Sequence, residues 1–229
     1  NIIGSAVAQV ALPDFAQYCC KNENGMFKKA FNDAIQLSLY LVLPIVAVML
    51  VLRLPIVRLI YGTGAFDWQD TLLTAWTLAL LSISIIGQTV VQIVLRAFYA
   101  MKDTWRPLIA ITVGIVLNLL GAYLFTNFFS HYYDWRPILE QVWVQVASAN
   151  GEGVLSVLRS FLGDILKWMT TRGDSSLAVG GLAFSLSLSY FVQMILSVYL
   201  LNRNRQVVSW KETFYPTLLK LLNTLIMMS

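Results

Sequence analysis

Charged residues are scarce in this 229-residue chain, where Asp, Glu, Lys and Arg together make up 12% of the positions. Soluble domains contain about twice that share. Between Thr71 and Leu95 no charged residue occurs. An α-helix rises about 1.5 Å per residue, so about 20 apolar residues cross the roughly 30 Å hydrocarbon core of a bilayer. The scarcity of charge therefore excludes an ordinary soluble domain and favours a membrane protein.

Histidine and cysteine are also scarce. His131 is the only histidine, and the two cysteines, Cys19 and Cys20, are adjacent. Adjacent cysteines do not form an ordinary structural disulfide with each other, and no metal-ligand spacing is present. We expect no metal site and no cofactor. We interpret the cysteines as small loop residues, with lipidation as the alternative.

Catalytic patterns are missing from the sequence as well. No glycine-rich phosphate loop precedes a predicted helix, and no nucleophile accompanies a histidine and an acid. We therefore expect that the protein is not an enzyme.

The chain contains instead a series of long apolar runs. Four of them lack Asp, Glu, Lys and Arg throughout: Ala34 to Leu52, Thr71 to Leu95, Pro107 to Ser130 and Ser175 to Asn202. A fifth begins near Thr213 and stops at Ser229, while Asn1 to Pro13 resembles the end of a sixth, closed by Pro13. Because the chain begins without Met, we interpret it as a piece of a longer protein. These runs predict an all-α, polytopic transmembrane helix bundle.

Cations in the connections predict the orientation of this bundle. If each run crosses once, one side carries nine cations: Lys21, Lys28, Lys29, Arg96, Lys102, Arg106, Arg203, Arg205 and Lys211. The other side carries six, partly diluted in a long connection: Arg53, Arg58, Arg136, Arg159, Lys167 and Arg172. The side richer in cations is predicted to be cytoplasmic. Topology thus explains the net charge of +4 better than nucleic-acid binding does.

Polar residues recur every four positions within two of the runs. The first series is Ser84, Gln88, Gln92 and Arg96, and the second is Gly181, Ser185, Ser189, Gln193 and Ser197. Residues at this spacing share one face of a helix. Such a face either lines a wet cavity or packs against a neighbouring helix, because an unsatisfied amide facing lipid costs several kcal/mol. The sequence leaves both alternatives open.

The segment from Ser130 to Asp174 has a different composition, with more Trp, Glu, Gln and Gly. Between Glu152 and Trp168 apolar residues recur at helical spacing. We interpret this segment as an extracytoplasmic amphipathic insertion that lies on the outer leaflet. Alternatives are that it caps a cavity or binds another protein.

Short motifs lie between the apolar runs in a characteristic order. Leu12 and Pro13 come first, followed by Tyr-Gly-x-Gly-x-Phe at 61–66 and Arg-x-Phe-Tyr-Ala-x-x-Asp-Thr-x-x-Pro at 96–107. In this order and spacing, the chain resembles the MurJ (MviN) family, bacterial lipid II flippases of the multidrug/oligosaccharidyl-lipid/polysaccharide exporter superfamily. The residues that carry the resemblance are Pro13, Gly62, Gly64, Phe66, Arg96, Phe98, Tyr99, Asp103 and Pro107.

The resemblance implies a fold of fourteen helices in two lobes around a central cavity, with this chain in the second lobe. Residues 1–127 would run from the end of helix 8 to helix 11. Residues 128–174 would be the extracytoplasmic insertion. Residues 175–229 would hold helix 12, a cytoplasmic loop and part of helix 13.

The resemblance also implies a function, namely moving lipid II or a related undecaprenyl-linked lipid across the bacterial inner membrane by alternating access. The partner of this lobe would be the N-terminal lobe. We predict the substrate path at Ser84, Gln88, Gln92, Arg96, Asn118, Ser185, Ser189 and Gln193. Some family members hold a cation with an asparagine at the position of Asn118 and an acidic residue one turn later, where this chain has Ala122.

Other functions remain open at this stage. The chain could belong to a polysaccharide-lipid flippase or a cation-coupled drug exporter of the same superfamily. It could also be a membrane scaffold that does not transport and binds partners through its outer insertion.

Overall fold

The structure, a computed structural model, describes residues 2–21, 23–62, 67–131 and 178–205. These residues form helices and no strand: α1 (Ile2–Cys20), α2 (Asn24–Val51), α3 (Arg53–Tyr61), α4 (Trp68–Ala100), α5 (Trp105–Ser130) and α8 (Ala178–Arg205). The helices α2, α4, α5 and α8 are long and apolar enough to cross a membrane. The predicted all-α, multi-spanning bundle is confirmed.

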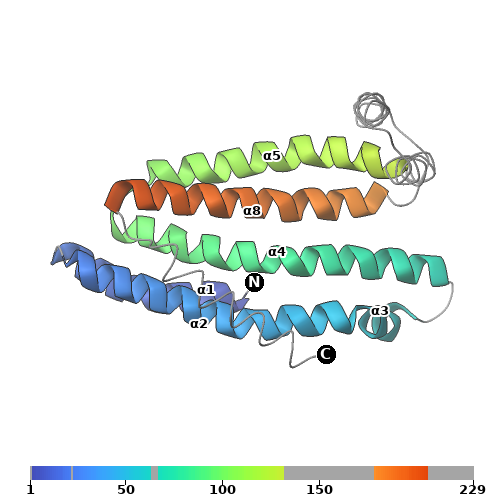
Figure 1. Ribbon diagram of the computed structural model, residues 1–229, viewed down its shortest axis with the longest axis horizontal. Coiled ribbons are helices and arrows are strands. Elements are labelled where there is room, and N and C mark those ends of the chain that lie inside the picture. Colours follow the sequence, from blue (N-terminus) through green and yellow to red (C-terminus); the bar gives the residue numbers. More distant parts are fainter. Residues whose placement is uncertain (1, 22, 63–66, 132–177, 206–229) are drawn as a thin grey trace, which may run out of the picture.

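The long helices lie side by side, and α8 occupies the place between α4 and α5 (Figure 1). It packs along both of them, whereas α4 and α5 touch each other only near the turn that joins them. On its other side α4 packs against α1 and α2. The arrangement therefore leaves α4 and α5 separated over most of their length, with α8 bridging them.

The apolar core lies where α1, α2, α4 and α8 meet. Phe15 packs against Phe27 and Phe31, with ring centroids 5.5 and 6.2 Å apart. Phe98 and Leu201 are completely buried in the same cluster. Because two of the phenylalanines precede the apolar run, α2 begins ten residues before the predicted start at Ala34. The prediction counted only uncharged residues, and missed that the first turns of α2 bury one apolar face.

The predicted end of the first helix at Pro13 is wrong, because α1 continues through this proline to Cys20. Proline lacks a main-chain N–H and normally breaks a helix. In α1, Ala8 and Phe15 are fully buried on either side of Pro13, so contacts with α2 and α4 hold both halves of the helix. Neighbouring helices commonly support prolines in membrane helices in this way.

The prediction that Arg96 to Ala100 lie in a connection is also wrong, since these residues form the last turns of α4. Ala97 and Phe98 are completely buried, and this burial extends the helix beyond the uncharged run. The helix ends at Ala100, and Lys102 in the turn that follows has a left-handed φ of 58°. Lys102 N donates to Tyr99 O and Asp103 N donates to Phe98 O, the two bonds of a Schellman turn.

The predicted alternation of the connections is confirmed within the described residues. The turns around residues 21–23 and 101–104 lie at one end of the bundle, and α3 lies at the other (Figure 1). Gly62 follows α3 with a φ of −72°. Gly64, Phe66, the insertion beyond residue 131 and the run from Thr213 lie outside the described residues.

Candidate functional site: a polar groove between α4, α5 and α8

Two serines on opposite sides of α8 hold it to its neighbours. The hydroxyl of Ser187 donates to Leu80 O on α4 at 2.6 Å, and the hydroxyl of Ser185 donates to Asn118 O on α5 at 2.9 Å. Residues two apart in a helix point about 200° apart, so one short segment of α8 bonds both neighbours. These bonds fix the position of α8 along the lengths of α4 and α5.

Glycines bring the backbones of these helices into close contact. A Cβ on Gly87 of α4 would lie 3.3 Å from Tyr190 O on α8, which is tighter than most real contacts. On the α5 side, a Cβ on Gly121 would lie 2.6 Å from the hydroxyl oxygen of Ser185. A Cβ on Gly181 would lie 2.6 Å from the carbonyl carbon of Phe125. Such contacts are typical of membrane helices that associate through small residues.

Beside these contacts, residues of α4, α5 and α8 line a groove of about 380 Å³. We call it the amide groove. Its lining includes five polar residues of the predicted substrate path: Gln88, Gln92, Asn118, Ser189 and Gln193. Gln88, Gln92 and Asn118 are half-buried, while Ser189 and Gln193 are buried. The groove thus collects five of the eight residues that we predicted for the substrate path.

The other three predicted path residues have different positions. Ser84 is buried at a helix contact, where its hydroxyl donates to Leu81 O at 2.6 Å and accepts from Gln88 Nε2 at 3.2 Å. Ser185 makes the bond to α5 described above. Arg96 is half-buried and does not line the groove. The two alternatives for the polar series, cavity lining and helix packing, therefore apply to different members of the same series.

Sequence reasoning missed Tyr190 and Gly114, which also line the amide groove. A Cβ on Gly114 would lie 3.0 Å from Gln193 Oε1, so the absence of a side chain there makes room for that amide. A glycine within a long apolar run indicates that another residue packs closely against the helix at that position. The sequence does not reveal which residue of which helix that is.

The chemistry of the amide groove is that of neutral hydrogen bonding. The groove contains three glutamine or asparagine amides on α4 and α5 and one on α8. Each amide offers an N–H₂ donor and a carbonyl acceptor, and Ser189 adds a hydroxyl. No charged residue is part of the lining that the described residues form. Such a groove suits a ligand rich in hydroxyl and amide groups more than an isolated ion.

The residues of the 96–107 motif form the turn between α4 and α5. Phe98 is completely buried, whereas Tyr99 is exposed. Asp103 pairs with Arg106 through Oδ2 and a guanidinium nitrogen at 3.2 Å. Pro107 is buried in the first turn of α5, where its missing N–H costs no helical bond, as predicted. The motif therefore fixes a tight turn rather than presenting a ligand site.

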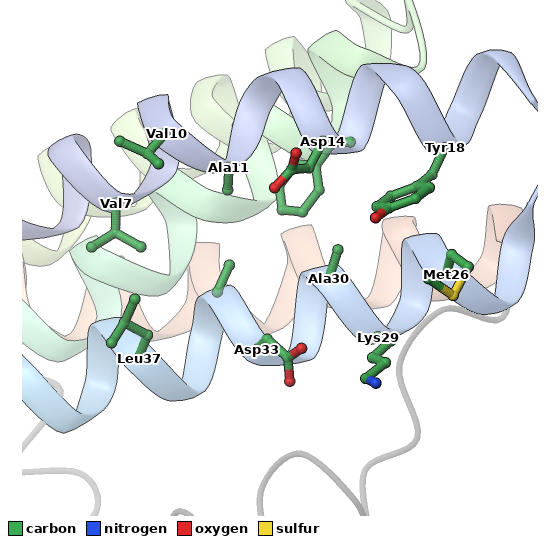
Figure 2. A pocket seen from close by; sticks show the side chains of 12 residues that line it. Val7, Val10, Ala11, Asp14, Tyr18, Met26, Lys29, Ala30, Asp33 and Leu37 are labelled. Carbon is green, nitrogen blue, oxygen red and sulfur yellow. The ribbon is translucent and has the colours of Figure 1, made fainter.

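A second hollow, of about 400 Å³, lies between α1 and α2 (Figure 2). Asp14 and Tyr18 come from α1, while Lys29 and Asp33 come from α2. The three charged residues are exposed and most of the remaining lining is apolar, including Val7 and others on both helices. No residue of the predicted substrate path lies in it.

Four helices long and apolar enough to cross a membrane, three of which line a polar groove, define a multi-pass helical membrane protein. The family described as Lipid II flippase MurJ matches residues 1–133. This match covers more than half of the chain, and the chain belongs to the MurJ family.

Curated relatives agree with this assignment. A probable lipid II flippase MurJ from Rhizobium meliloti is 28% identical over 119 residues, which are 52% of this chain and 22% of the relative. One from Rickettsia prowazekii is 30% identical over 118 residues, 52% of this chain and 23% of the relative. One from Synechocystis is 28% identical over 198 residues, 86% of this chain and 34% of the relative. The chain thus spans between about a fifth and a third of the length of these relatives.

Proposed function

We propose that the full-length protein containing this chain flips lipid II from the cytoplasmic to the outer leaflet of the bacterial inner membrane. The proposal is supported by membership of the MurJ family and by the curated relatives, which carry the name lipid II flippase. The chain supplies part of the second lobe and works with the N-terminal lobe by alternating access. The protein acts as a transporter and catalyses no covalent step.

The amide groove is the observation that carries the proposal within this chain. A lipid-linked sugar and peptide head presents many hydroxyl and amide groups, which pair with the amides of Gln88, Gln92 and Gln193. A lipid tail needs no such partners, because it remains in the bilayer. We infer that the groove contacts the neutral part of the head while the pyrophosphate is bound elsewhere in the full-length protein.

The groove favours a flippase over a cation-coupled exporter of the same superfamily. A cation site needs several oxygen ligands and usually a carboxylate. Ala122 stands one turn after Asn118, and no carboxylate lines the groove within the described residues. Amide groups without an acidic partner are suited to polar head groups.

The experiment is rescue of bacteria depleted of their own lipid II flippase. The full-length protein is expressed unchanged, with Gln88→Leu and Gln193→Leu combined, and with the control Gln17→Leu, which removes an exposed amide from α1. Expression and membrane insertion are measured for each. We expect rescue by the unchanged protein and by the control, and at least tenfold fewer survivors with the groove variant.

The outcomes separate two claims. If the well-inserted, unchanged protein does not rescue growth, the proposed lipid II activity is wrong. If it rescues growth and the groove variant does so equally well, the activity stands and the role of the amide groove is wrong.

A further inference from the structure

The short helix α3 lies at the end of the bundle opposite the turn at residues 101–104 and runs across the long helices (Figure 1). Val57 is buried and fixes one face of α3 to the bundle, where α3 packs on α4. Leu59, on the opposite face, is 88% accessible, and the neighbouring Ile60 is 62% accessible. A short helix with this pattern is typical of a segment at the membrane surface.

Both arginines of α3 lie over tryptophan rings of α4. The guanidinium carbon of Arg53 is 4.7 Å from the ring centroid of Trp76, and that of Arg58 is 4.5 Å from that of Trp68. At these distances the positive charge is attracted to the electron-rich face of the ring. Each contact covers a flat face of the guanidinium and limits the positions that the side chain can take.

The edges of both guanidinium groups carry the N–H donors. Within the described residues neither arginine forms an ion pair or a side-chain hydrogen bond. The carboxylates at the start of α4 are engaged with the main chain: Asp67 accepts from Trp68 N at 2.6 Å, and Asp70 accepts from Asp67 N at 3.4 Å. Two arginines are thus positioned whose donors have no partner among the described residues.

The tryptophans place these arginines at the depth of lipid head groups. Trp76 follows Trp68 by eight residues, which is about 12 Å along a helix. Both indoles are more than half exposed, as expected for aromatic residues in the belt at a membrane surface. With 33 residues α4 is about 50 Å long, so its ends extend beyond a hydrocarbon core of roughly 30 Å.

We propose that Arg53 and Arg58, each held over a tryptophan of α4, each bind the phosphate of an anionic phospholipid at this end of the bundle. Planar guanidinium groups bind phosphate with two parallel hydrogen bonds, which a lysine ammonium does not reproduce. The exposed leucine and isoleucine of α3 contact the acyl chains of the same lipid. The site does not depend on the proposed transport activity.

The test measures lipid binding to the purified full-length protein by native mass spectrometry. Dioleoyl phosphatidylglycerol is compared with dioleoyl phosphatidylcholine, which has the same chains and no net charge. The variants are Arg53→Gln with Arg58→Gln, and Trp68→Leu with Trp76→Leu, which keeps both charges. The control, Lys102→Gln with Arg203→Gln, removes two exposed cations at the opposite end. Arg53→Lys with Arg58→Lys serves if the glutamine variant does not fold.

We expect the unchanged protein to prefer phosphatidylglycerol at least tenfold. The arginine-to-glutamine variant should lose this preference, the tryptophan variant should bind about three- to tenfold more weakly, and the lysine variant about threefold more weakly. The control should bind phosphatidylglycerol within twofold of the unchanged protein.

Equal binding of both lipids, or unchanged binding by the arginine variants, overturns the proposal. Unchanged binding by the tryptophan variant overturns the role of the rings, and displacement by millimolar inorganic phosphate overturns the assignment to a lipid.

Discussion

The hydroxyl of Ser187 on α8 donates to the main-chain oxygen of Leu80 on α4 at 2.6 Å, across 107 positions of sequence. It also donates to Ala183 O in its own helix at 3.0 Å. Together with the bond from Ser185 to Asn118, this contact sets the position of α8 between the two helices that border the amide groove. The geometry of the groove therefore depends on two serine hydroxyls, those of Ser185 and Ser187, that are not part of its lining.

Ser187→Ala should destabilise the protein by about 0.6 kcal/mol, the average measured for hydrogen bonds between membrane helices. Ser189→Ala is the matched control, because Ser189 is buried on the same helix and forms no hydrogen bond within the described residues. The free energy of unfolding is measured by denaturant titration of the full-length protein in detergent. Equal losses for both variants would contradict the assigned role of Ser187.

Gly181→Ala should destabilise the packing of α8 on α5 by about 1–3 kcal/mol, the usual cost of forcing extra atoms into a packed contact. The new Cβ would lie 2.6 Å from the carbonyl carbon of Phe125 and 2.7 Å from Thr126 N. These are backbone atoms, which cannot rotate aside. Gly180→Ala is the control, since a Cβ there meets nothing within 4 Å. The control should melt at the same temperature as the unchanged protein or slightly higher, and equal melting of both variants would refute the close contact.

Lys102→Gly should stabilise the turn between α4 and α5 by about 1 kcal/mol, because a side chain at left-handed φ costs 1–2 kcal/mol and glycine avoids this cost. Lys102 has φ 58° and occupies the Schellman position where glycine is usual. Lys102→Ala removes the same charge but keeps the unfavourable Cβ, so it should give no gain. The measurement is the midpoint of thermal unfolding, and a gain shared by both variants would point to charge rather than backbone conformation.

The predicted orientation places the end with Cys20 in the cytoplasm and the start of α4 on the outer side. In a full-length background in which Cys20 is the only cysteine, we expect it to react with a membrane-impermeant maleimide only after the cells are opened. Cysteine in place of Gln69, an exposed residue at the start of α4, should react in intact spheroplasts. The reverse pattern would invert the topology.

The sequence alone determined the class of fold, the number and order of the spans described here, and the ends at which the connections gather. These follow from local properties, since a run without charge long enough to cross hydrocarbon needs no knowledge of its neighbours. The same reasoning located the amides of Gln88 and Gln193 on polar helix faces. The sequence also revealed the family resemblance, because its short motifs occur in a characteristic order.

Tertiary structure decided how these local features are used. Ser84 and Gln88 belong to one series, yet one is buried at a helix contact and the other lines a groove, because α8 touches only part of that face. Tertiary packing also explains why α1 continues beyond Pro13 and α4 continues beyond Arg96. Burial of Phe15 and Phe98 stabilises the additional helical turns, although the local sequence favours a helix end at these positions. No periodic pattern in the sequence predicts that Trp68 and Trp76 contact two arginines of another helix. Such a contact depends on how the two helices are rotated and shifted relative to each other.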